Sequence, residues 1–151
     1  MKHKAIVVDL DNTLAMLGER HPYDGHLCET DALCPVVGRT ISAFREDHWV
    51  IFLTGRSSRT KSATKSWLAR HGLSEDILFM REDGDWRTGA EYKAEVMRER
   101  ILPKYEVVLA LDDDPDIVSA FRSMGVRTWW VNDYDPALPE RRHLEETDGD
   151  Y

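Results

Sequence analysis

The sequence predicts an α/β fold with three layers, a Rossmann-like parallel sheet with helices on both faces. Short apolar runs without polar alternation, rich in Val, Ile, Leu and Trp, are typical of strands buried on both faces. These runs are residues 5–10, 49–53, 77–80, 107–111 and 128–131. Segments with helical spacing separate them, and strands that alternate with helices form right-handed βαβ units around a parallel sheet.

The predicted helices are recognised by apolar spacing and by their end signals. They are residues 36–47, 58–71, 90–101 and 115–124. In the first of them, Val37, Ile41 and Phe44 form one apolar stripe. The last begins with Pro115 in its first turn and is followed by Gly125, which is the usual asymmetry of helix ends.

The length of 151 residues suits one hydrophobic core, and we expect a single domain over residues 1–132. Residues 15–34 form a polar insert after the first strand, and residues 133–151 form an acidic C-terminal extension. The formal charge of −8 argues against a broad basic surface for nucleic acid or a membrane. A partner that a few arginines hold locally remains compatible with this charge.

We expect neither a targeting segment nor cysteine chemistry from this sequence. No apolar run approaches the roughly 18 residues that span a bilayer. The amino-terminal stretch is basic and then apolar, but its apolar part is too short for a signal peptide, so we expect a cytoplasmic protein without a membrane partner. Cys28 and Cys34 lack metal-ligand spacing, and we expect both as reduced thiols.

Polar clusters follow three of the predicted strands. They are Asp9-Leu10-Asp11-Asn12-Thr13, Thr54-Gly55-Arg56 and Asp112-Asp113-Asp114-Pro115-Asp116. Ligands bind at the carboxyl ends of strands in open parallel sheets, and Lys93 lies on a helix that could reach the same crevice. Converging carboxylates repel each other unless a divalent cation neutralises them, and oxygen ligands favour Mg²⁺.

The ordered set of Asp-x-Asp-x-Thr, Thr-Gly-Arg, a lone Lys and an Asp-Asp pair resembles the four motifs of the haloacid dehalogenase superfamily of phosphatases. The resemblance covers residues 4 to about 132. It implies that Asp9 attacks phosphorus and forms an aspartyl-phosphate, and that Asp11 serves as general acid and then general base.

The same resemblance assigns the remaining groups of the site. It implies Mg²⁺ ligation by Asp9, by the backbone carbonyl of Asp11 and by Asp113, with Asp112 beside them. Thr54 and Lys93 would hold the phosphoryl oxygens, with Gly55 between Thr54 and the substrate-binding Arg56.

A second likeness concerns the arginines. The insert and the segment before Lys93 resemble the 3′-phosphatase domain of the bacteriophage polynucleotide kinase/phosphatase enzymes. On that resemblance Arg20, Arg56 and Arg81 contact substrate or order the site, and Asp85 and Arg87 match more weakly in the same loop. These enzymes carry an acid four residues before the lysine, where this chain has Gly89.

The expected function is therefore a Mg²⁺-dependent polynucleotide 3′-phosphatase that acts on 3′-phosphorylated DNA or RNA ends. The minimal cap insert after strand 1 favours a polymer end as substrate. This chain has no GxxxxGK[ST] phosphate loop, so any kinase partner, like any ligase, would be separate. We expect Trp86 either to anchor its loop or to stack on a terminal base, and Trp129 and Trp130 to pack in the core and against helices.

Two other functions compete with this one. A small-molecule phosphatase or 3′-nucleotidase would use the same residues. A phospho-accepting receiver module also has an acid pair, a phospho-Asp, a Thr and a Lys, but its acid pair ends the first strand, whereas here Asp112-Asp113 follows the fourth. The sequence distinguishes neither DNA from RNA nor one oligomeric state from another.

Overall fold

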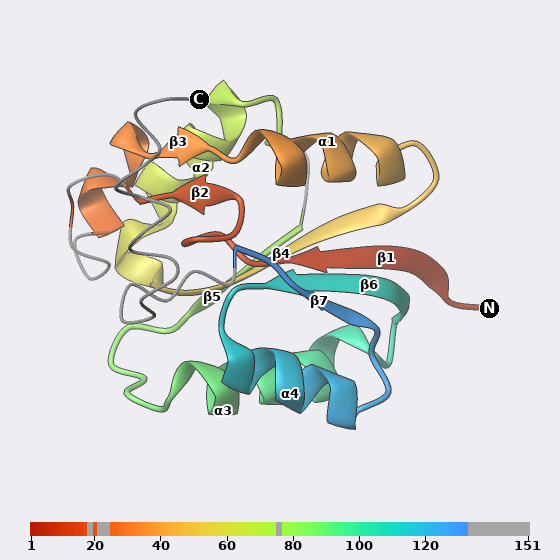
Figure 1. Cartoon of the computed structure of the whole chain (residues 1–151). Coiled ribbons are helices and arrows are strands. Elements are labelled where there is room, and N and C mark those ends of the chain that lie inside the picture. The colour runs from red at the N-terminus through yellow and green to blue at the C-terminus, as the bar shows by residue number, and fades with distance from the viewer. Residues whose placement is uncertain (18–19, 21–24, 75–76, 133–151) are drawn as a thin grey trace, which may run out of the picture.

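A computed structural model describes residues 1–17, 20, 25–74 and 77–132 of the chain. The described residues form a five-stranded parallel sheet in the order β5-β4-β1-β6-β7 (Figure 1). Its strands are β1 (His3–Val8), β4 (Trp49–Ser57), β5 (Ile77–Arg81), β6 (Tyr105–Asp112) and β7 (Thr128–Trp130). The chain leaves β1 toward one edge and later returns to the other side of β1, so a crevice opens at the carboxyl end of this central strand.

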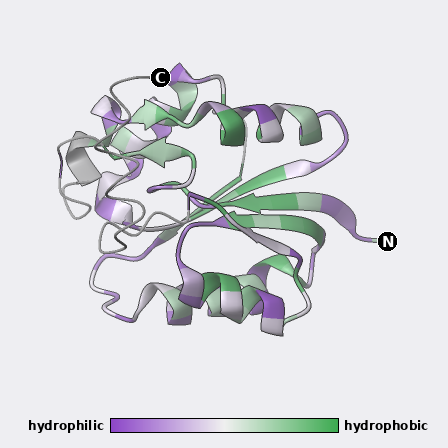
Figure 2. Ribbon diagram, in the orientation of Figure 1, coloured by the Kyte–Doolittle hydropathy of each residue, from purple (hydrophilic) through white to green (hydrophobic). Residues whose placement is uncertain are grey.

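Helices cover both faces of the sheet, which confirms the predicted fold class. Helices α1 (Pro35–Phe44) and α2 (Lys61–Arg70) lie on one face, and α3 (Gly89–Val96) and α4 (Pro115–Ser123) lie on the other (Figure 1). The apolar sheet runs between them (Figure 2).

Strand β1 shows why the apolar runs lack polar alternation. Ile6 and Val8 belong to the core under α1 and α2, together with Trp67, whereas Ala5 and Val7 belong to the core under α3 and α4. Successive side chains of a strand point to opposite faces. Both sets must therefore be apolar when both faces are covered.

The ends of several elements differ from the sequence expectation. Strand β4 continues to Ser57 because the Thr54-Gly55-Arg56 segment stays in the sheet, although its pairing with β5 shifts register between Thr54 and Ser57. The predicted helix 58–71 begins as a 3₁₀ turn, Ser58–Thr60, before α2. The predicted helix 90–101 consists of α3 and a π-helical turn, Met97–Ile101.

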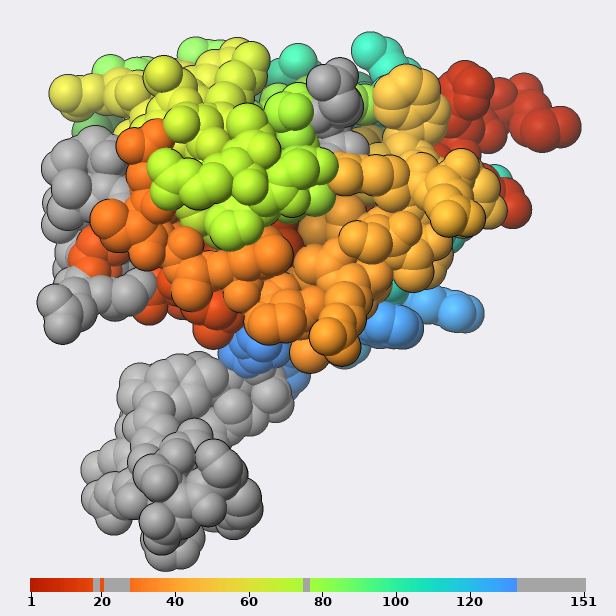
Figure 3. Space-filling model, turned by 90° about the horizontal axis from the view of Figure 1, so that it is seen from above, coloured from red at the N-terminus to blue at the C-terminus, as the bar shows by residue number. Residues whose placement is uncertain are grey.

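The insert after β1 is small and packs on α2. Two short antiparallel strands, β2 (Ala15–Met16) and β3 (Ala32–Leu33), close it, and a 3₁₀ helix, Gly25–Thr30, lies between them. The Trp67 indole donates to the carbonyl of Asp31 at 2.9 Å. In Figure 3 the insert (orange) lies against α2 (yellow to lime). Residues 18–19 and 21–24 of the insert and the acidic extension 133–151 lie outside the described residues.

Strand β7 forms one edge of the sheet, and this position corrects the expectation for its two tryptophans. Trp129 and Trp130 are about half exposed, at 51% and 48%, rather than core residues. An edge strand has a neighbour on one side only, here β6, so its side chains are covered less. In the described part of the chain, no helix has the length and apolar character to cross a bilayer.

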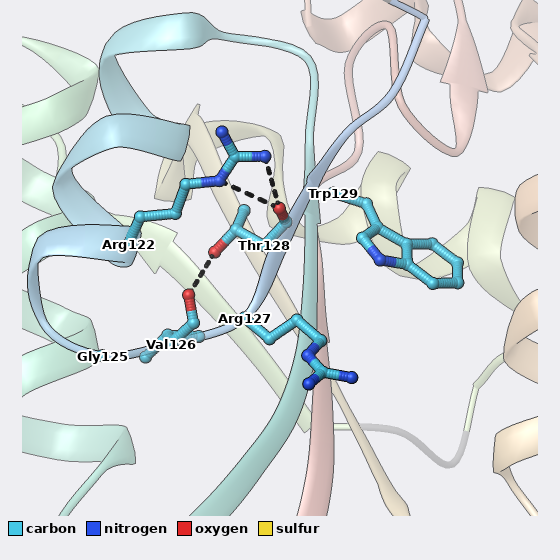
Figure 4. Close-up of a pocket in the computed structure, with 6 residues that line it drawn as sticks. All are labelled: Arg122, Gly125, Val126, Arg127, Thr128 and Trp129. Atoms are coloured by element: carbon cyan, nitrogen blue, oxygen red, sulfur yellow. Dashed lines mark hydrogen bonds between the residues drawn. The ribbon is translucent and has the colours of Figure 1, made fainter.

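A hollow beside β7 lies where α4 turns into the strand (Figure 4). Its polar groups bond to one another: the Arg122 guanidinium donates to the carbonyl of Thr128 at 2.9 and 3.2 Å, and the Thr128 hydroxyl donates to the carbonyl of Val126 at 3.0 Å. The Trp129 side chain points away from these groups, on the other side of the strand (Figure 4). We assign this hollow a structural role, closing the end of α4.

Candidate active site

The centre of the site is a buried lysine between two carboxylates. Lys93 Nζ lies 2.7 Å from Asp9 Oδ1 and 2.7 Å from Asp112 Oδ2. Asp9 follows β1 and extends its ladder, since its N–H donates to the carbonyl of Leu111 at 3.0 Å. Asp112 is the last residue of β6. The neighbouring carboxyl ends of two parallel strands thus bring together residues that are far apart in sequence.

Helix α3 supplies the lysine from a fixed position. Thr88 caps its N-terminus in a capping box with Glu91, so the first turn is defined by reciprocal hydrogen bonds. Burial alone would lower the pKa of Lys93, but the carboxylates of Asp112 and Asp9 outweigh burial and raise it. Lys93 therefore stays charged and balances the acids.

Three carboxylates form a group that could hold a metal. Asp9, Asp112 and Asp113 each offer one oxygen, and these oxygens lie within 4.8 Å of one another. Burial, and next the Asp9 carboxylate, raise the pKa of Asp113 to about 8 and that of Asp112 to about 6. A cluster of hard oxygen donors in which negative charge is unfavourable fits a divalent cation such as Mg²⁺.

The Asp11 side chain lies outside this carboxylate group and is bound by two arginines. Arg56 donates to Asp11 Oδ1 through Nε at 3.0 Å and Nη2 at 2.6 Å, and Arg20 Nη2 donates to the same oxygen at 3.0 Å. Both guanidiniums also bind Asp31: Arg20 at 2.7 and 2.6 Å, and Arg56 at 3.2 Å. We call these four residues, Arg20, Arg56, Asp11 and Asp31, the arginine clamp.

Asp31 is the residue of the clamp to which the sequence assigned no role. Its side chain has no exposed surface, and its hydrogen bond is the main cause that raises the pKa of Arg20. The side chains of Arg20 and Arg56 are themselves only 2% exposed. No signal in the sequence pointed to Asp31, because the burial of the two arginines, which makes a further counter-charge necessary, arises only in the folded chain.

The Thr54-Gly55-Arg56 segment sits at the irregular end of β4. Thr54 is fully buried, and its hydroxyl accepts from the backbone N–H of Arg56 at 3.1 Å, which leaves the hydroxyl proton available for another acceptor. Arg56 Nη1 donates to the Thr64 hydroxyl of α2 at 3.1 Å. The register shift with β5 lets this segment turn its polar groups toward the sheet end.

The other predicted substrate residues lie in and beside the loop of residues 82–88, between β5 and α3. Arg81 Nη1 donates to the carbonyl oxygens of Asp85 and Arg87, and the Arg81 guanidinium lies 5.3 Å from the centre of the Tyr92 ring. Arg87 pairs with Asp85 at 2.8 Å and with Glu95 at 2.6 Å. The Arg87 hydrogen bond lowers the pKa of Asp85 to about 2. The contacts of Asp85 and Arg87 therefore shape the loop.

The glycine four residues before Lys93 lies beside this arginine. A Cβ on Gly89 would be 4.0 Å from Arg81 Nη2, and a Cβ on Gly55 would be 3.5 Å from the same atom. An acidic side chain at position 89 would have its first carbon next to the guanidinium. Glycine leaves Arg81 without that counter-charge.

Side-chain hydrogen bonds fix the turn that carries Asp9 and Asp11. Asn12 has a φ of 60°, a left-handed conformation that Asn tolerates better than most residues. The Asn132 side chain, just beyond β7, donates to the carbonyl oxygens of Asn12 at 2.9 Å and Thr13 at 3.0 Å. The Thr13 hydroxyl in turn donates to Asp9 Oδ2 at 2.9 Å. These bonds hold Asp9 and the following turn in one geometry.

With this geometry in place, the family of the chain is settled by a match to a family model. Residues 3–135 match the model of the polynucleotide kinase PNKP phosphatase domain, a haloacid dehalogenase-type domain. The chain belongs to this family.

Individual relatives agree with the family. Two structures of the Pnkp1/Rnl/Hen1 RNA repair complex match at 31% identity over 86% of this chain, with TM-scores of 0.82 and 0.83. A protein of Autographa californica nuclear polyhedrosis virus, whose assigned name is bifunctional polynucleotide kinase/RNA ligase, is 26% identical over 129 residues, 83% of this chain. The haloacid dehalogenase domain of the Legionella pneumophila effector Lem4 shares the fold, with 12% identity and a TM-score of 0.57 over 97% of this chain and 93% of its own.

The repair-complex chains and the viral protein are larger than the matched region. The chain spans 42% and 46% of the two repair-complex chains and 19% of the viral protein. The match is therefore to one domain of each, and the activities of the whole proteins do not transfer with it.

Proposed function

We propose that this PNKP-type domain is a Mg²⁺-dependent polynucleotide 3′-phosphatase that hydrolyses terminal 3′-phosphate monoesters through an aspartyl-phosphate. One observation carries the proposal: the buried Lys93 joins Asp9 to Asp112 at 2.7 Å each, while a separate pair of arginines holds Asp11. Two acids that lie close in sequence thus have different surroundings. That division suits a nucleophile and a proton carrier.

In the first half-reaction an Asp9 oxygen attacks phosphorus and the bond from phosphorus to the sugar oxygen breaks. The departing alkoxide takes a proton from Asp11, because a sugar alkoxide is a poor leaving group. Lys93 and the Thr54 hydroxyl donate to phosphoryl oxygens in the transition state, in a buried setting where such bonds are strong.

In the second half-reaction Asp11 takes a proton from a water molecule whose oxygen attacks phosphorus. The bond from phosphorus to Asp9 breaks, which releases phosphate. Asp9 is again a carboxylate, and Asp11 again carries the proton that it donates in the first half-reaction. The arginine clamp orients Asp11 for both steps, since three N–H groups fix one of its oxygens.

A metal ion has a place in this scheme. Asp9, Asp112 and Asp113 would hold Mg²⁺, with the backbone carbonyl of Asp11 as the family resemblance implies, and the bound cation would offset charge on the phosphate and the carboxylates. The residues of the chain still perform the attack and the proton transfers.

The insert and the relatives support a polymer end as substrate. The described part of the insert folds down onto α2 as one short strand pair and a 3₁₀ helix. A polymer end can approach a site with so small a cap. Since two of the relatives come from an RNA repair complex, we propose RNA ends first and DNA ends second, with a kinase or ligase unit as functional partner.

The test compares kcat/KM for a 3′-phosphorylated RNA oligonucleotide, its DNA counterpart, a 3′-mononucleotide and an aryl phosphate, each with Mg²⁺ and with a chelator. We expect the oligonucleotides to be preferred, the chelator to stop turnover and Asp9→Asn to be inactive. Glu106→Gln, an exposed acid at the opposite end of β6, is the matched control and should keep full activity. Equal kcat/KM on all four substrates would contradict the polynucleotide proposal and indicate a small-molecule phosphatase or 3′-nucleotidase.

The lifetime of the phosphoenzyme distinguishes a receiver module from the proposed phosphatase. After treatment with acetyl phosphate, a switch protein keeps its aspartyl-phosphate for minutes. The proposed phosphatase should lose it within the time of one turnover, and Asp11→Asn should prolong its life. A phosphoenzyme that persists for minutes in the unmodified protein would contradict the proposal.

A further inference from the structure

The most exposed aromatic side chain among the described residues is Trp86, at 91% of its full surface. It lies in the loop of residues 82–88, which follows the carboxyl end of β5. Single exposed apolar residues are common on protein surfaces. This one differs because its loop is held by hydrogen bonds and because Arg81 links that loop to Gly55, in the Thr54–Arg56 segment of the proposed phosphate site.

Hydrogen bonds fix the loop to α3, which follows it, and to the 3₁₀ turn after β4. The Asp83 N–H donates to the Ser58 hydroxyl at 3.1 Å, which ties the loop to this turn. The Arg87 guanidinium pairs with Glu95 of α3 at 2.6 Å. An indole on such a loop loses little freedom when it binds, since its backbone is already ordered.

Arg81 connects Trp86 to the phosphate site. Its Nη1 donates to the carbonyl oxygens of Asp85 and Arg87, the residues on either side of Trp86. Its Nη2 lies against Gly55, next to Thr54. The buried Nε has no hydrogen-bond partner among the described residues, and the guanidinium is hydrogen-bonded there through Nη1 only, so Nη2 keeps capacity for an anion.

We propose that Trp86 is the stacking platform for the terminal nucleobase of the substrate, and that Arg81 faces the sugar–phosphate between this base and the Thr54–Arg56 segment. The inference rests on the proposed polynucleotide 3′-phosphatase function and deepens it. Every base has a π face, so the subsite binds a terminal nucleotide without reading its sequence. Stacking acts on ground state and transition state alike and therefore lowers KM.

The experiment measures Trp86→Ala on two substrates: a 3′-phosphorylated oligonucleotide, and the same oligonucleotide with an abasic terminal residue. Stacking on an aromatic side chain corresponds to a change of about 5-fold to about 150-fold per base. We expect Trp86→Ala to lower kcat/KM by that factor on the intact substrate, through KM, and by less than about 2-fold on the abasic one. Trp86→Phe should keep most of the activity on both.

Trp49→Ala is the matched control. Trp49 is 49% exposed and begins β4, at the opposite end of the sheet from the site. Its loss should therefore leave kcat/KM unchanged on both substrates. Thermal unfolding of both variants checks that the fold is retained.

The two proposals fail in different ways. An unmodified protein that does not prefer the oligonucleotide over an aryl phosphate would contradict the proposed function. An oligonucleotide preference that Trp86→Ala leaves unchanged, or reduces equally on intact and abasic substrates, would overturn the stacking platform alone. If Trp86 binds a protein partner and not a base, Trp86→Ala should leave kcat/KM on the oligonucleotide unchanged, which is this second result.

Discussion

Replacing Asp31 by asparagine removes one negative charge from the arginine clamp with almost no change of shape. The Asp31 side chain is completely buried and accepts hydrogen bonds from Arg20 Nε, Arg20 Nη2 and Arg56 Nη2, at 2.7, 2.6 and 3.2 Å. The variant would leave two arginine side chains, each only 2% exposed, short of a buried counter-charge.

The expected cost follows from that burial. Removing one partner of a buried ion pair destabilises a protein by about 3–5 kcal/mol. Because the asparagine side chain of the variant would keep one carbonyl acceptor, we expect the lower end of this range, about 3 kcal/mol. That is a large part of the stability of a typical domain but leaves most molecules folded. The guanidiniums would also hold Asp11 less firmly, and misplacement of a reacting group costs up to about 100-fold in rate.

Urea unfolding and steady-state kinetics measure the two effects on the same protein sample. The control is Glu99→Gln, which removes an exposed partner of Arg98 at 3.9 Å and should cost less than about 0.5 kcal/mol. A loss for Asp31→Asn within about 1 kcal/mol of the control, together with unchanged kcat/KM, would show that the clamp neither stabilises the fold nor positions Asp11.

Three further predictions concern the centre of the site. Lys93→Met should lower kcat at least about 100-fold, as loss of a transition-state donor does, and activity within a few-fold of the unmodified protein would remove Lys93 from the mechanism. In the presence of a chelator, the free energy of unfolding should fall as pH rises from about 4 to about 8. The folded protein keeps a proton on Asp112 up to about pH 6 and on Asp113 up to about pH 8, whereas the unfolded chain has released both. Mg²⁺ should flatten the slope, because it replaces these protons. Chemical denaturation at several pH values measures both curves, and a rise with pH would contradict the raised pKa values. Asn12→Ala should cost about 1 kcal/mol and Asn12→Gly should cost less, because only glycine adopts a φ of 60° without strain; equal melting temperatures for the two variants would contradict this.

The sequence was sufficient for the fold class and for the convergence of the main acids. Apolar runs without alternation can be buried only between two helical layers, and β1 shows this with neighbouring residues in two cores. The carboxyl ends of parallel strands meet at one edge, so the positions of Asp9 and Asp112 followed from their places after two strands. The motif order identified the superfamily, which the family model confirms.

The tertiary structure decided which charges pair. Lys93 and Asp9 are 84 residues apart, and Arg56 and Asp11 are 45 apart. No local pattern records that Asp31 bridges two arginines, or that Gly89 lies beside Arg81. These contacts depend on how the insert packs on α2 and on how the loop of residues 82–88 docks on the sheet.

The same distinction explains the tryptophans at the end of the chain and in the loop. Composition alone made Trp129 and Trp130 look like core residues, but the strand order put β7 at an edge, where they are half exposed. The proposed role of Trp86 depends on the contacts that hold its loop, and on Arg81 next to Gly55 of the Thr54–Arg56 segment. Periodicity is local and survives in the sequence, whereas pairing and exposure arise from contacts between distant residues, which only the folded chain establishes.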